Sequence, residues 1–508
     1  MNTTTTPTIA QKLLDTAIWG GKMYVNGWKV SQNGTADVTD KATGEVLATI
    51  ANAGPADVRE ACRLAVRAGR TWAAVPADER AAILRRAGEI LDQYKDEAIY
   101  WTVRESGSTK FKAHLEVAGT KAMFDQSADD ATQPSRKVLK DDADMLSYIE
   151  RVPLGVVGVI GPFNFPLSLA LRSVAAALAM GNAVVLKPSL NTAVSGAVII
   201  ARVLEEAGLP EGVLQVLPGG DEAGAAIVDD PNISMIAFTG STSVGRQIAS
   251  NAGRTLKRVA LELGGKNPLL VLSDADLEAA ARAGAFGTFL HQGQVCLAVG
   301  IHLVHKALID RYTARVAELA KAIKVGDPYL EQVGLGPIIN EKQRNHIYSI
   351  VEEAIQAGAE LVEGGTFEGL FYRPTVLKNV PQNTRAFKEE LFGSVAVIVP
   401  FEDESEAIRL ANGTGYGLSA AVFGELEHAR QVGAQIESGM VHLNDMTIMG
   451  DPMVPLEAQK HLETPAELAA TRVSKSTRHG AGTLKHVSRN HTRSHRCSRE
   501  SVGDRPSC

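Results

Sequence analysis

Short runs rich in Val and Ile alternate with helical stretches between residues 155 and 270, and this alternation constrains the fold more than any other feature. Such an order builds a parallel β-sheet covered by helices. The predicted strands are Val156–Ile160, Ala183–Leu186, Val213–Val216, Met235–Phe238 and Val259–Leu263. The predicted helices between them are Leu171–Met180, Val194–Glu206 and Val244–Ala252. We therefore predict a doubly wound α/β unit, whose ligand binds at the carboxyl ends of the strands.

Regular structure is also predicted on both sides of this unit. Apolar residues recur at three- and four-residue steps over the first hundred residues, which indicates two amphipathic helices. Beyond residue 270 the pattern predicts a second α/β region, with a helix at Leu277–Leu290, a strand at Ile301–Val304 and a helix at Leu308–Ile323. The polar segment 127–147 precedes the first strand of the sheet and is predicted to form a connecting hairpin.

The composition fits a soluble globular protein. Of the 508 residues, 45% are hydrophobic and 22% are charged, which excludes wholesale disorder. The net charge of −6 gives no reason to expect nucleic acid as a partner. The most apolar stretch, Leu167–Leu186, contains Arg172 and Asn182, so that a helix, a turn and a strand are favoured over a membrane span.

Cysteine usage points to a reducing compartment. The chain has four cysteines without the paired spacing of a disulfide framework or a metal site, namely Cys62, Cys296, Cys497 and Cys508. The first residues lack the basic and apolar regions that are typical of an export signal. We therefore expect a cytoplasmic protein with no metal site and no membrane partner.

Two segments could bind a phosphate-containing ligand. Gly240, Ser241 and Gly245 follow a predicted strand and begin a helix, whose N-terminus offers free N–H groups and the positive end of the helix dipole. Lys187 follows another buried strand and places an ammonium group at the same edge of the sheet. Taken alone, each pattern also fits an ordinary turn.

Two further residues could carry catalysis. Cys296 ends a polar, glycine-containing loop after a predicted helix, where a thiol is accessible to react. Glu262 lies among apolar residues at a strand end, where loss of solvation would raise the pKa of a carboxylate toward that of a useful general base. For each residue taken alone, the alternatives are an inert cysteine and a locally paired carboxylate.

In combination, these segments resemble the aldehyde dehydrogenase superfamily over residues 20–455. The order of the motifs matches, and Glu262 lies 34 residues before Cys296, as the family requires. The matching motifs are Gly161-Pro162-Phe163-Asn164-Phe165-Pro166, Lys187-Pro188-Ser189, Phe238-Thr239-Gly240-Ser241, Leu261-Glu262-Leu263-Gly264-Gly265, Gln292-Gly293-Gln294-Val295-Cys296 and Glu389-Glu390-Leu391-Phe392-Gly393. The segments that look like those of benzaldehyde, vanillin and salicylaldehyde dehydrogenases are Arg172–Val174, His291–Cys296 and Gly439–Asp445.

The resemblance implies oxidation of an aldehyde, aromatic by the subfamily match, to the carboxylic acid. Cys296 would be the nucleophile that forms a thiohemiacetal and then a thioester. Asn164 and the backbone N–H of Cys296 would stabilise the oxyanion. Glu262 would activate the water that releases the acid.

The resemblance also implies NAD as the cofactor. Lys187 and Glu390 match residues that hold the two riboses, and Phe392 matches one that packs near the nicotinamide. The Gly240-Ser241 turn, with Gly245 in the helix that follows, matches the phosphate-binding turn.

Three positions depart from the family pattern. Leu190 stands where many NAD-selective relatives have a carboxylate, so NADP is not excluded. Phe163 replaces the usual Trp, and Ser394 replaces a common Pro. We expect the last two to be tolerated.

The family architecture implies three parts. These are an NAD(P)-binding domain of residues 1–126 and 148–262, a bridging and oligomerisation hairpin at 127–147, and a catalytic domain at 263–445. A homo-oligomer is expected of the family. Two other functions are open: a CoA-acylating relative, which Glu262 disfavours because it supplies the base for hydrolysis, and a cofactor-binding protein made inactive by its altered C-terminus.

The last residues differ in kind from the rest of the chain. From Thr471 to Cys508 there are nine Lys or Arg and two Asp or Glu, and no Phe, Tyr or Trp occurs after Phe423. After Pro455 the family has a Gly-rich run and a final strand, whereas this chain continues Leu456-Glu457-Ala458-Gln459-Lys460-His461. Restoring one T at the Leu456 codon permits the family-like ending FGGAKASGNSGRIGGNAGIEEY.

We therefore predict that residues 456–508 arise from a frameshift and form a disordered tail, which would weaken the oligomer. A basic, His-rich appendage that binds metal or polyanions is the alternative. DNA sequence across the Pro455 codon tests the hypothesis, because codons incompatible with the family-like ending would contradict it.

Overall fold

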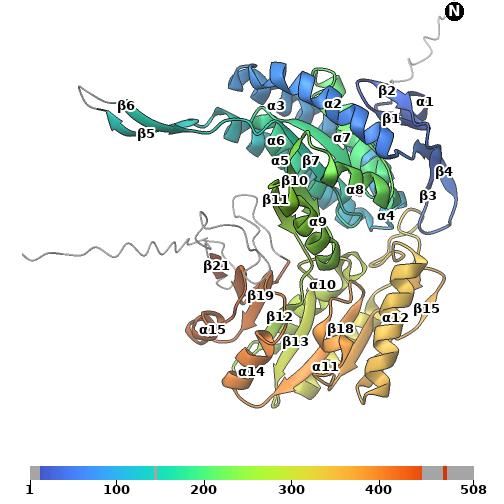
Figure 1. The fold of residues 1–508 in the computed structure, drawn as a ribbon. Helices are drawn as coiled ribbons and strands as arrows, with labels where there is room; N and C mark the ends of the chain where they lie inside the picture. The colour runs from blue at the N-terminus through green and yellow to red at the C-terminus, as the bar shows by residue number, and fades with distance from the viewer. Residues whose placement is uncertain (1–11, 142–145, 449–472, 477–508) are drawn as a thin grey trace, which may run out of the picture.

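The computed structural model describes residues 12–141, 146–448 and 473–476. Two α/β bodies, each built around its own sheet, stack on one another, and a long hairpin projects away from them (Figure 1). The predicted fold class is confirmed: both sheets are mostly parallel and covered by helices. Within the described residues, no helix combines the length and the apolar character that a membrane crossing needs.

The first sheet contains the five predicted strands in parallel, with two antiparallel strands added at one edge. Each predicted strand lies within three residues of its observed bounds. In spatial order the strands are β11 (Arg258–Glu262), β10 (Ile233–Thr239), β7 (Val156–Ile160), β8 (Ala183–Lys187), β9 (Leu214–Val216), β1 (Lys22–Tyr24) and β2 (Trp28–Val30).

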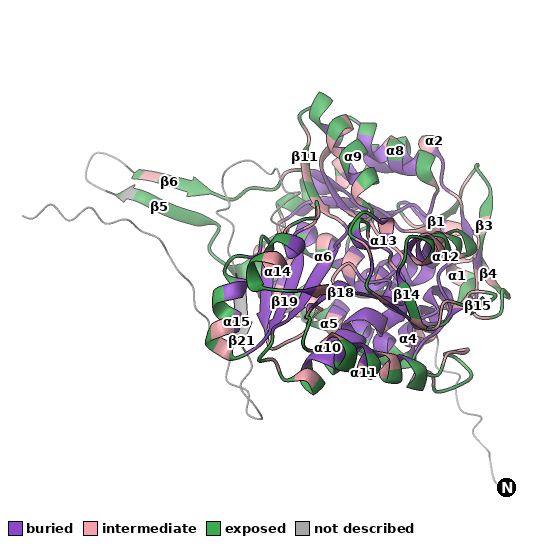
Figure 2. Cartoon of the chain, turned by 90° about the horizontal axis from the view of Figure 1, so that it is seen from below, coloured by how far each residue is buried: buried purple, intermediate pink, exposed green. Residues whose placement is uncertain are grey.

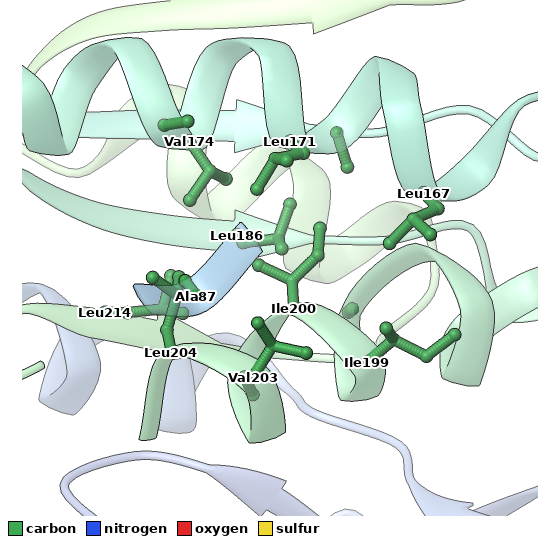
Figure 3. Close-up of a cluster of buried hydrophobic side chains, with 14 of the residues drawn as sticks. Ala87, Leu167, Leu171, Val174, Leu186, Ile199, Ile200, Val203, Leu204 and Leu214 are labelled. Atoms are coloured by element: carbon green, nitrogen blue, oxygen red, sulfur yellow. The ribbon is translucent and has the colours of Figure 1, made fainter. Parts of the chain in front are cut away.

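The central strands are buried along their whole length, which explains their unbroken apolar sequence. In one buried cluster, Leu186 lies between Leu171 and Val174 on one side and Ile200 and Leu204 on the other (Figure 3). The helices of this body are α1 (Thr16–Trp19), α2 (Pro55–Ala73), α3 (Ala77–Gln93), α4 (Lys95–Ser106), α5 (Lys110–Thr132), α6 (Pro166–Ala179), α7 (Ile199–Glu206), α8 (Asp221–Asp229) and α9 (Thr242–Arg254).

The predicted helix Val194–Glu206 is two elements. A π-helical turn, Val194–Val198, precedes α7. The buried carboxylate of Glu105, on α4, accepts hydrogen bonds from the N–H groups of Val194 (2.8 Å) and Ser195 (2.7 Å). Backbone N–H groups at the start of a helix have no partner within that helix, and here a carboxylate on another helix accepts their hydrogen bonds. The local sequence around Val194 gives no sign of this partner.

The second sheet is parallel except for β14 at its edge. Its spatial order is β14 (Glu360–Glu363), β17 (Thr375–Lys378), β18 (Val395–Phe401), β13 (Val299–His305), β12 (Asn267–Val271), β19 (Ser419–Phe423), β20 (Met440–Leu443) and β21 (Val473–Ser476). Its helices are α10 (Leu277–Phe289), α11 (Ile309–Ala322), α12 (Glu341–Gln356), α13 (Arg385–Lys388), α14 (Glu404–Ala411) and α15 (Leu426–Gly433). Two small hairpins pair β3 (Thr35–Thr39) with β4 (Val46–Ala51), and β15 (Phe367–Glu368) with β16 (Phe371–Tyr372).

The connecting hairpin is present, but its predicted bounds of 127–147 are wrong. Helix α5 continues to Thr132, because Phe124, Ala128 and Ala131 extend its buried face into the core. The hairpin itself is β5 (Arg136–Asp141) paired with β6 (Leu146–Glu150). It stands clear of both bodies with mostly exposed residues (Figure 2).

Most of the predicted disordered tail, 456–508, lies outside the described residues. Within it, Val473–Ser476 forms strand β21, which pairs in parallel with β20. These four residues depart from the prediction of a tail without structure. The boundaries of the predicted NAD(P)-binding and catalytic domains stay predictions.

Truncation of the buried Leu171 side chain tests the packing of α6 on the first sheet. Leu171→Ala removes apolar atoms from a fully buried position and should cost about 2–5 kcal/mol of unfolding free energy. All four tryptophans, Trp19, Trp28, Trp72 and Trp101, belong to this body, so urea unfolding followed by tryptophan fluorescence measures it. The control is Leu330→Ala at a 74% exposed position. An equal effect of both changes would contradict the described core.

Candidate active site

The carboxyl ends of strands in the first sheet face the amino ends of strands in the second sheet. Strands β7, β10 and β11 of the first sheet end at Ile160, Thr239 and Glu262. In the second sheet, β12 starts two residues after Gly265 and β13 starts three residues after Cys296. Chain segments from both bodies therefore converge on one place.

A cavity of about 800 Å³ lies at this meeting point. Its wall contains seven of the nine predicted site residues, namely Asn164, Lys187, Gly240, Ser241, Cys296, Glu390 and Phe392. Gly245 and Glu262 do not line it, although their neighbours Val244 and Leu263 do. The structure thus brings seven residues that are distant in sequence together at one cavity, and the other two are each next in sequence to a wall residue. Their roles stay predictions.

The topology of the first sheet places this cavity. From β7 the chain moves through β8 and β9 on one side, and it then returns to add β10 and β11 on the other. The loops that follow β7 and β10 therefore diverge at the carboxyl edge of the sheet. Such a switch point is where doubly wound sheets bind their ligands, and both Asn164 and Gly240 lie in these two loops.

The loop before Cys296 has an unusual backbone. His291, Gln292 and Gly293 have φ values of 49°, 59° and 70°, in the left-handed region. For the two non-glycine residues this conformation costs energy and persists only where neighbours hold it. The side chain of Gln292 provides such a hold, because its Nε2 donates to the carbonyl oxygens of Gly107 (3.0 Å) and Pro337 (2.7 Å).

The backbone around Cys296 is fixed from the second sheet. The Nδ2 group of Asn267, at the start of β12, donates to the carbonyl oxygens of Cys296 (2.8 Å) and Ala298 (2.7 Å). A Cβ at Gly265 would lie 2.2 Å from the carbonyl oxygen of Cys296, so only glycine permits this approach.

The thiol of Cys296 is partly buried, and its surroundings favour the neutral form. Burial, together with the carboxylates of Glu390 and Glu262, raises its pKa to about 12. The guanidinium of Arg172 acts in the opposite direction. The thiol is therefore protonated near neutral pH and needs a proton acceptor or a nearby positive charge to react.

Glu262 is the last residue of β11 and its side chain is partly buried. Its carbonyl oxygen accepts a hydrogen bond from Gly240 N–H (3.0 Å), which ties the strand end to the turn after β10. The carboxylate of Glu262 interacts electrostatically with the Cys296 thiol and raises its pKa.

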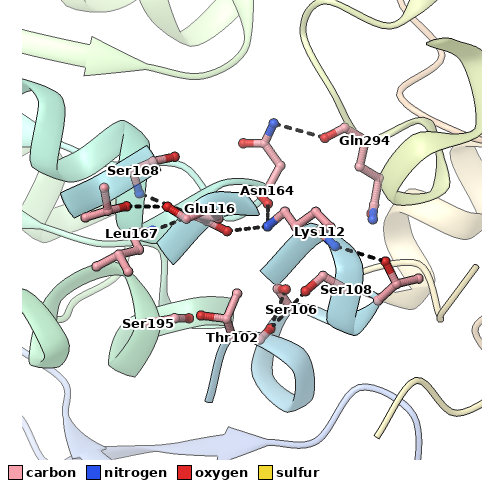
Figure 4. Close-up of polar contacts among 12 residues, drawn as sticks. Thr102, Ser106, Ser108, Lys112, Glu116, Asn164, Leu167, Ser168, Ser195 and Gln294 are labelled. Atoms are coloured by element: carbon pink, nitrogen blue, oxygen red, sulfur yellow. Dashed lines mark hydrogen bonds and ion pairs between the residues drawn. The ribbon is translucent and has the colours of Figure 1, made fainter. Parts of the chain in front are cut away.

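Asn164 lies in the loop between β7 and α6 and is buried. Its Nδ2 donates to the carbonyl oxygen of Gln294 (2.9 Å), two residues before Cys296 (Figure 4). One amide hydrogen is used in this bond, which leaves the second N–H of the same group as a donor beside Cys296 in the cavity.

Lys187 ends β8 with its ammonium group buried against the first sheet. Its Nζ donates to the carbonyl oxygens of Pro188 (3.0 Å) and Gly219 (2.9 Å). Burial lowers its pKa to about 8, and Asp221 opposes this shift. Across the cavity, Ser241 caps α9 by accepting from Val244 N–H at 3.5 Å, and Gly245 lets α9 approach Leu263, which a Cβ would meet at 2.4 Å.

Glu390 contributes a second carboxylate from the loop before β18. Its Oε1 accepts from Gly265 N–H (3.1 Å), and a Cβ at Gly264 would lie 2.1 Å from Oε2. Burial raises the pKa of Glu390 to about 7, against the effect of Lys266. Phe392 follows with a positive φ of 51° and packs edge-on against Phe163 at 5.7 Å between ring centres.

The three departures from the family pattern all fit the structure. Leu190 lines the cavity, and Phe163 packs on Phe392. The hydroxyl of Ser394 donates to the carbonyl oxygen of Gln292 at 3.3 Å. Within the described residues, no group of three or more His, Cys, Asp or Glu is arranged to hold a metal ion.

Comparison with known proteins decides the family. Residues 28–461 match the family model described as aldehyde dehydrogenase family. The chain belongs to the aldehyde dehydrogenase family. It is 46% identical to a vanillin dehydrogenase of Amycolatopsis sp. over 87% of this chain and 91% of that protein. It is also 46% identical to a benzaldehyde dehydrogenase [NAD(+)] of Pseudomonas putida, over 86% and 90%.

Solved structures agree with this assignment. A salicylaldehyde dehydrogenase from Pseudomonas putida G7, complexed with salicylaldehyde, superposes with a TM-score of 0.84 at 35% identity. The match covers 87% of this chain and 93% of that one. The family match ends at residue 461, so most of the segment 456–508 lies outside it.

Several residues that shape this aldehyde dehydrogenase site were missed by sequence reasoning. Asn267 and Gln292 hold the Cys296 loop through their amides. Lys266 is buried beside Glu390, with its Nζ donating to Ala386 O (2.7 Å), and burial lowers its pKa to about 7. The available signal was a lysine between the Gly264-Gly265 pair and an apolar strand. A lysine at such a position is expected to have a specific partner if it is buried, because lysine is rarely buried without one.

Alkylation of Cys296 tests the raised thiol pKa. With iodoacetamide, the rate at Cys296 should rise about tenfold for each pH unit from 7 to 10, because only the thiolate reacts. Glu390→Gln removes one of the charges that raise this pKa and should speed alkylation at pH 8 about threefold or more. Peptide mass spectrometry measures Cys296 separately from the other cysteines. The control is Glu389→Gln at the exposed neighbouring carboxylate, and a rate that levels off below pH 9 would contradict the shift.

Proposed function

We propose that this aldehyde dehydrogenase oxidises aromatic aldehydes to carboxylic acids with NAD as the electron acceptor. The observation that carries the proposal is that one cavity contains Cys296 and Asn164 together with Lys187 and Glu390. A nucleophile and an oxyanion donor thus share a wall with the residues matched to cofactor binding. The chain's similarity to benzaldehyde and vanillin dehydrogenases supports the aromatic substrate class.

The residues of the cavity fit a dinucleotide. The cavity lies at the switch point of the first sheet, with the N-terminus of α9 and the Ser241 hydroxyl at its wall. Gly219, Gly220 and Gly224 line the cavity, and a Cβ at Gly224 would lie 3.3 Å from Cε of Lys187. NAD supplies the hydride acceptor when bound. Leu190 neither binds a ribose hydroxyl nor repels a phosphate, which leaves NADP as a second acceptor.

In the first step, the sulfur of Cys296 attacks the carbonyl carbon of the aldehyde. A C–S bond forms, the carbonyl π pair moves onto oxygen, and the thiol proton passes to a neighbouring carboxylate, which releases it to solvent before the second step. The free N–H of Asn164 and the backbone N–H of Cys296 donate to that oxygen. Because the site is largely buried, these hydrogen bonds act in a low dielectric and are stronger than they would be in water.

In the second step, Glu262 acts as the general base. After oxidation the carbon is held to Cys296 as a thioester. Glu262 takes a proton from a water molecule, the water oxygen attacks the thioester carbon, and the C–S bond breaks. The acid leaves and the thiol is restored with the transferred proton. Two observations support this role: Glu262 precedes the wall residue Leu263, and its carboxylate raises the pKa of the Cys296 thiol.

The oligomer and the location are further parts of the proposal. The hairpin of β5 and β6 exposes Val138, Leu139, Tyr148 and Ile149, which favours contact with a second copy of this chain. The thin use of cysteine favours the cytoplasm.

NADH formation with benzaldehyde, vanillin and an aliphatic aldehyde tests the function. We expect turnover with the aromatic aldehydes, and no turnover by Cys296→Ala because no thiohemiacetal can form. Asn164→Ala should lower kcat about 100-fold, by loss of an oxyanion donor. Glu262→Gln should release a burst of NADH and then stop, because thioester hydrolysis lacks its base.

The matched control is Cys62→Ala, since Cys62 is buried on α2 away from the cavity and burial raises its pKa. Turnover that survives Cys296→Ala would overturn the mechanism. Faster turnover of the aliphatic aldehyde than of both aromatic ones would overturn the substrate class.

A further inference from the structure

A buried ion pair lies directly behind Asn164. Lys112 and Glu116 are one turn apart on α5, and both side chains are almost fully buried. The Nζ of Lys112 lies 2.5 Å from Glu116 Oε2. Placing two charges in the interior is costly, and such a pair is weak evidence for a stabilising role by itself. The position therefore calls for another explanation.

The ammonium group of Lys112 reaches the loop that carries the oxyanion donor. Its Nζ donates to the carbonyl oxygen of Asn164 at 2.7 Å (Figure 4). The same Nζ lies 4.3 Å from the centre of the Phe165 ring. The side chain of the same asparagine is tied to Gln294 O on the cysteine loop. Asn164 is thus held at its backbone by Lys112 and at its side chain by the loop of the nucleophile.

Glu116 fixes the other end of the same segment. Helix α6 begins at Pro166, and neither Pro166 nor Phe165 supplies a side-chain cap. Glu116 Oε1 accepts from the N–H groups of Leu167 (2.9 Å) and Ser168 (3.2 Å), so α5 caps α6 in place of a local residue. The carboxylate also meets the positive end of the helix dipole.

We propose that Lys112 and Glu116 are positioning residues for the oxyanion donor Asn164. They act through the backbone from Asn164 to Ser168 and touch neither the aldehyde nor the cofactor. The inference rests on the proposed function, because it assigns a role to Asn164 in the aldehyde step. An uncharged residue at position 112 would leave the Asn164 carbonyl without its donor and let the amide shift in the cavity.

Steady-state kinetics with benzaldehyde and NAD test this role. Lys112→Met keeps the length of the side chain but removes the donor, and it should lower kcat about 10- to 100-fold, the loss that a displacement near 1 Å produces. The KM for NAD and the rate of Cys296 alkylation by iodoacetamide should stay within about twofold, because neither depends on the oxyanion donor. Glu116→Gln should lower kcat about tenfold through the loss of the charge that orients Lys112.

A double-mutant cycle separates positioning from general stability. If Lys112 acts through Asn164, adding Lys112→Met to Asn164→Ala should change kcat by less than about twofold. If Lys112→Met lowers kcat as much in the Asn164→Ala background as it does in the unaltered chain, the proposal is wrong. The matched control is Glu105→Gln, a buried carboxylate on α4 that also accepts two backbone N–H groups at a helix start. It should keep kcat within about twofold.

Folding of the variants is checked by far-UV circular dichroism. If Lys112→Met does not fold, Lys112→Met/Glu116→Leu replaces it, because removing both charges leaves no unpaired ion in the core. If neither folds, the pair is only a folding element and the proposal is wrong. Absence of NADH formation by the unaltered chain contradicts the proposed function and this inference with it, whereas normal turnover with unchanged variants contradicts the positioning role alone.

Discussion

The close packing of Gly264 and Gly265, which link β11 to β12, against Glu390 and Cys296 is the constraint on which the site depends. A Cβ on Gly264 would meet Glu390 Oε2 at 2.1 Å, and one on Gly265 would meet Cys296 O at 2.2 Å. Because neither residue has a side chain, the four-residue link from β11 to β12 packs closely against Glu390 and the cysteine loop. Each body is folded around its own core, but the chemistry exists only where they touch.

Burial sets the ionisation of the groups that gather there. The pKa of the Cys296 thiol rises to about 12 and that of Glu390 to about 7, while the pKa of Lys187 falls to about 8 and that of Lys266 to about 7. All four shifts favour the neutral form, as loss of solvation requires. The free enzyme therefore holds a protonated, weakly reactive thiol in a site where any charge that develops during the reaction is strongly felt.

The strands β7 and β8 at the centre of the first sheet could be located from the sequence because both are buried along their whole length and consist almost entirely of apolar residues. Sequence reasoning misplaced the hairpin, because α5 from Phe124 to Ala131 continues its buried face through a segment that is otherwise polar. It also merged the π-helical turn at Val194 with α7, since the cap that stabilises that turn is Glu105, almost ninety residues away. The frameshift hypothesis for residues 456–508 is tested by the DNA sequence. Apart from β21, those residues lie outside the described part of the chain.

By itself the sequence determined the fold class and the family, and it predicted nine candidate site residues, because spacing and residue type at strand ends are local properties. Only the tertiary structure decided how these residues are held. Asn267 and Gln292 fix the cysteine loop, and Lys112 and Glu116 lie behind Asn164. Each of these contacts joins residues that are far apart in the chain. No pattern along the sequence encodes which distant backbone group a buried amide, ammonium or carboxylate will meet, since packing of the two bodies determines it.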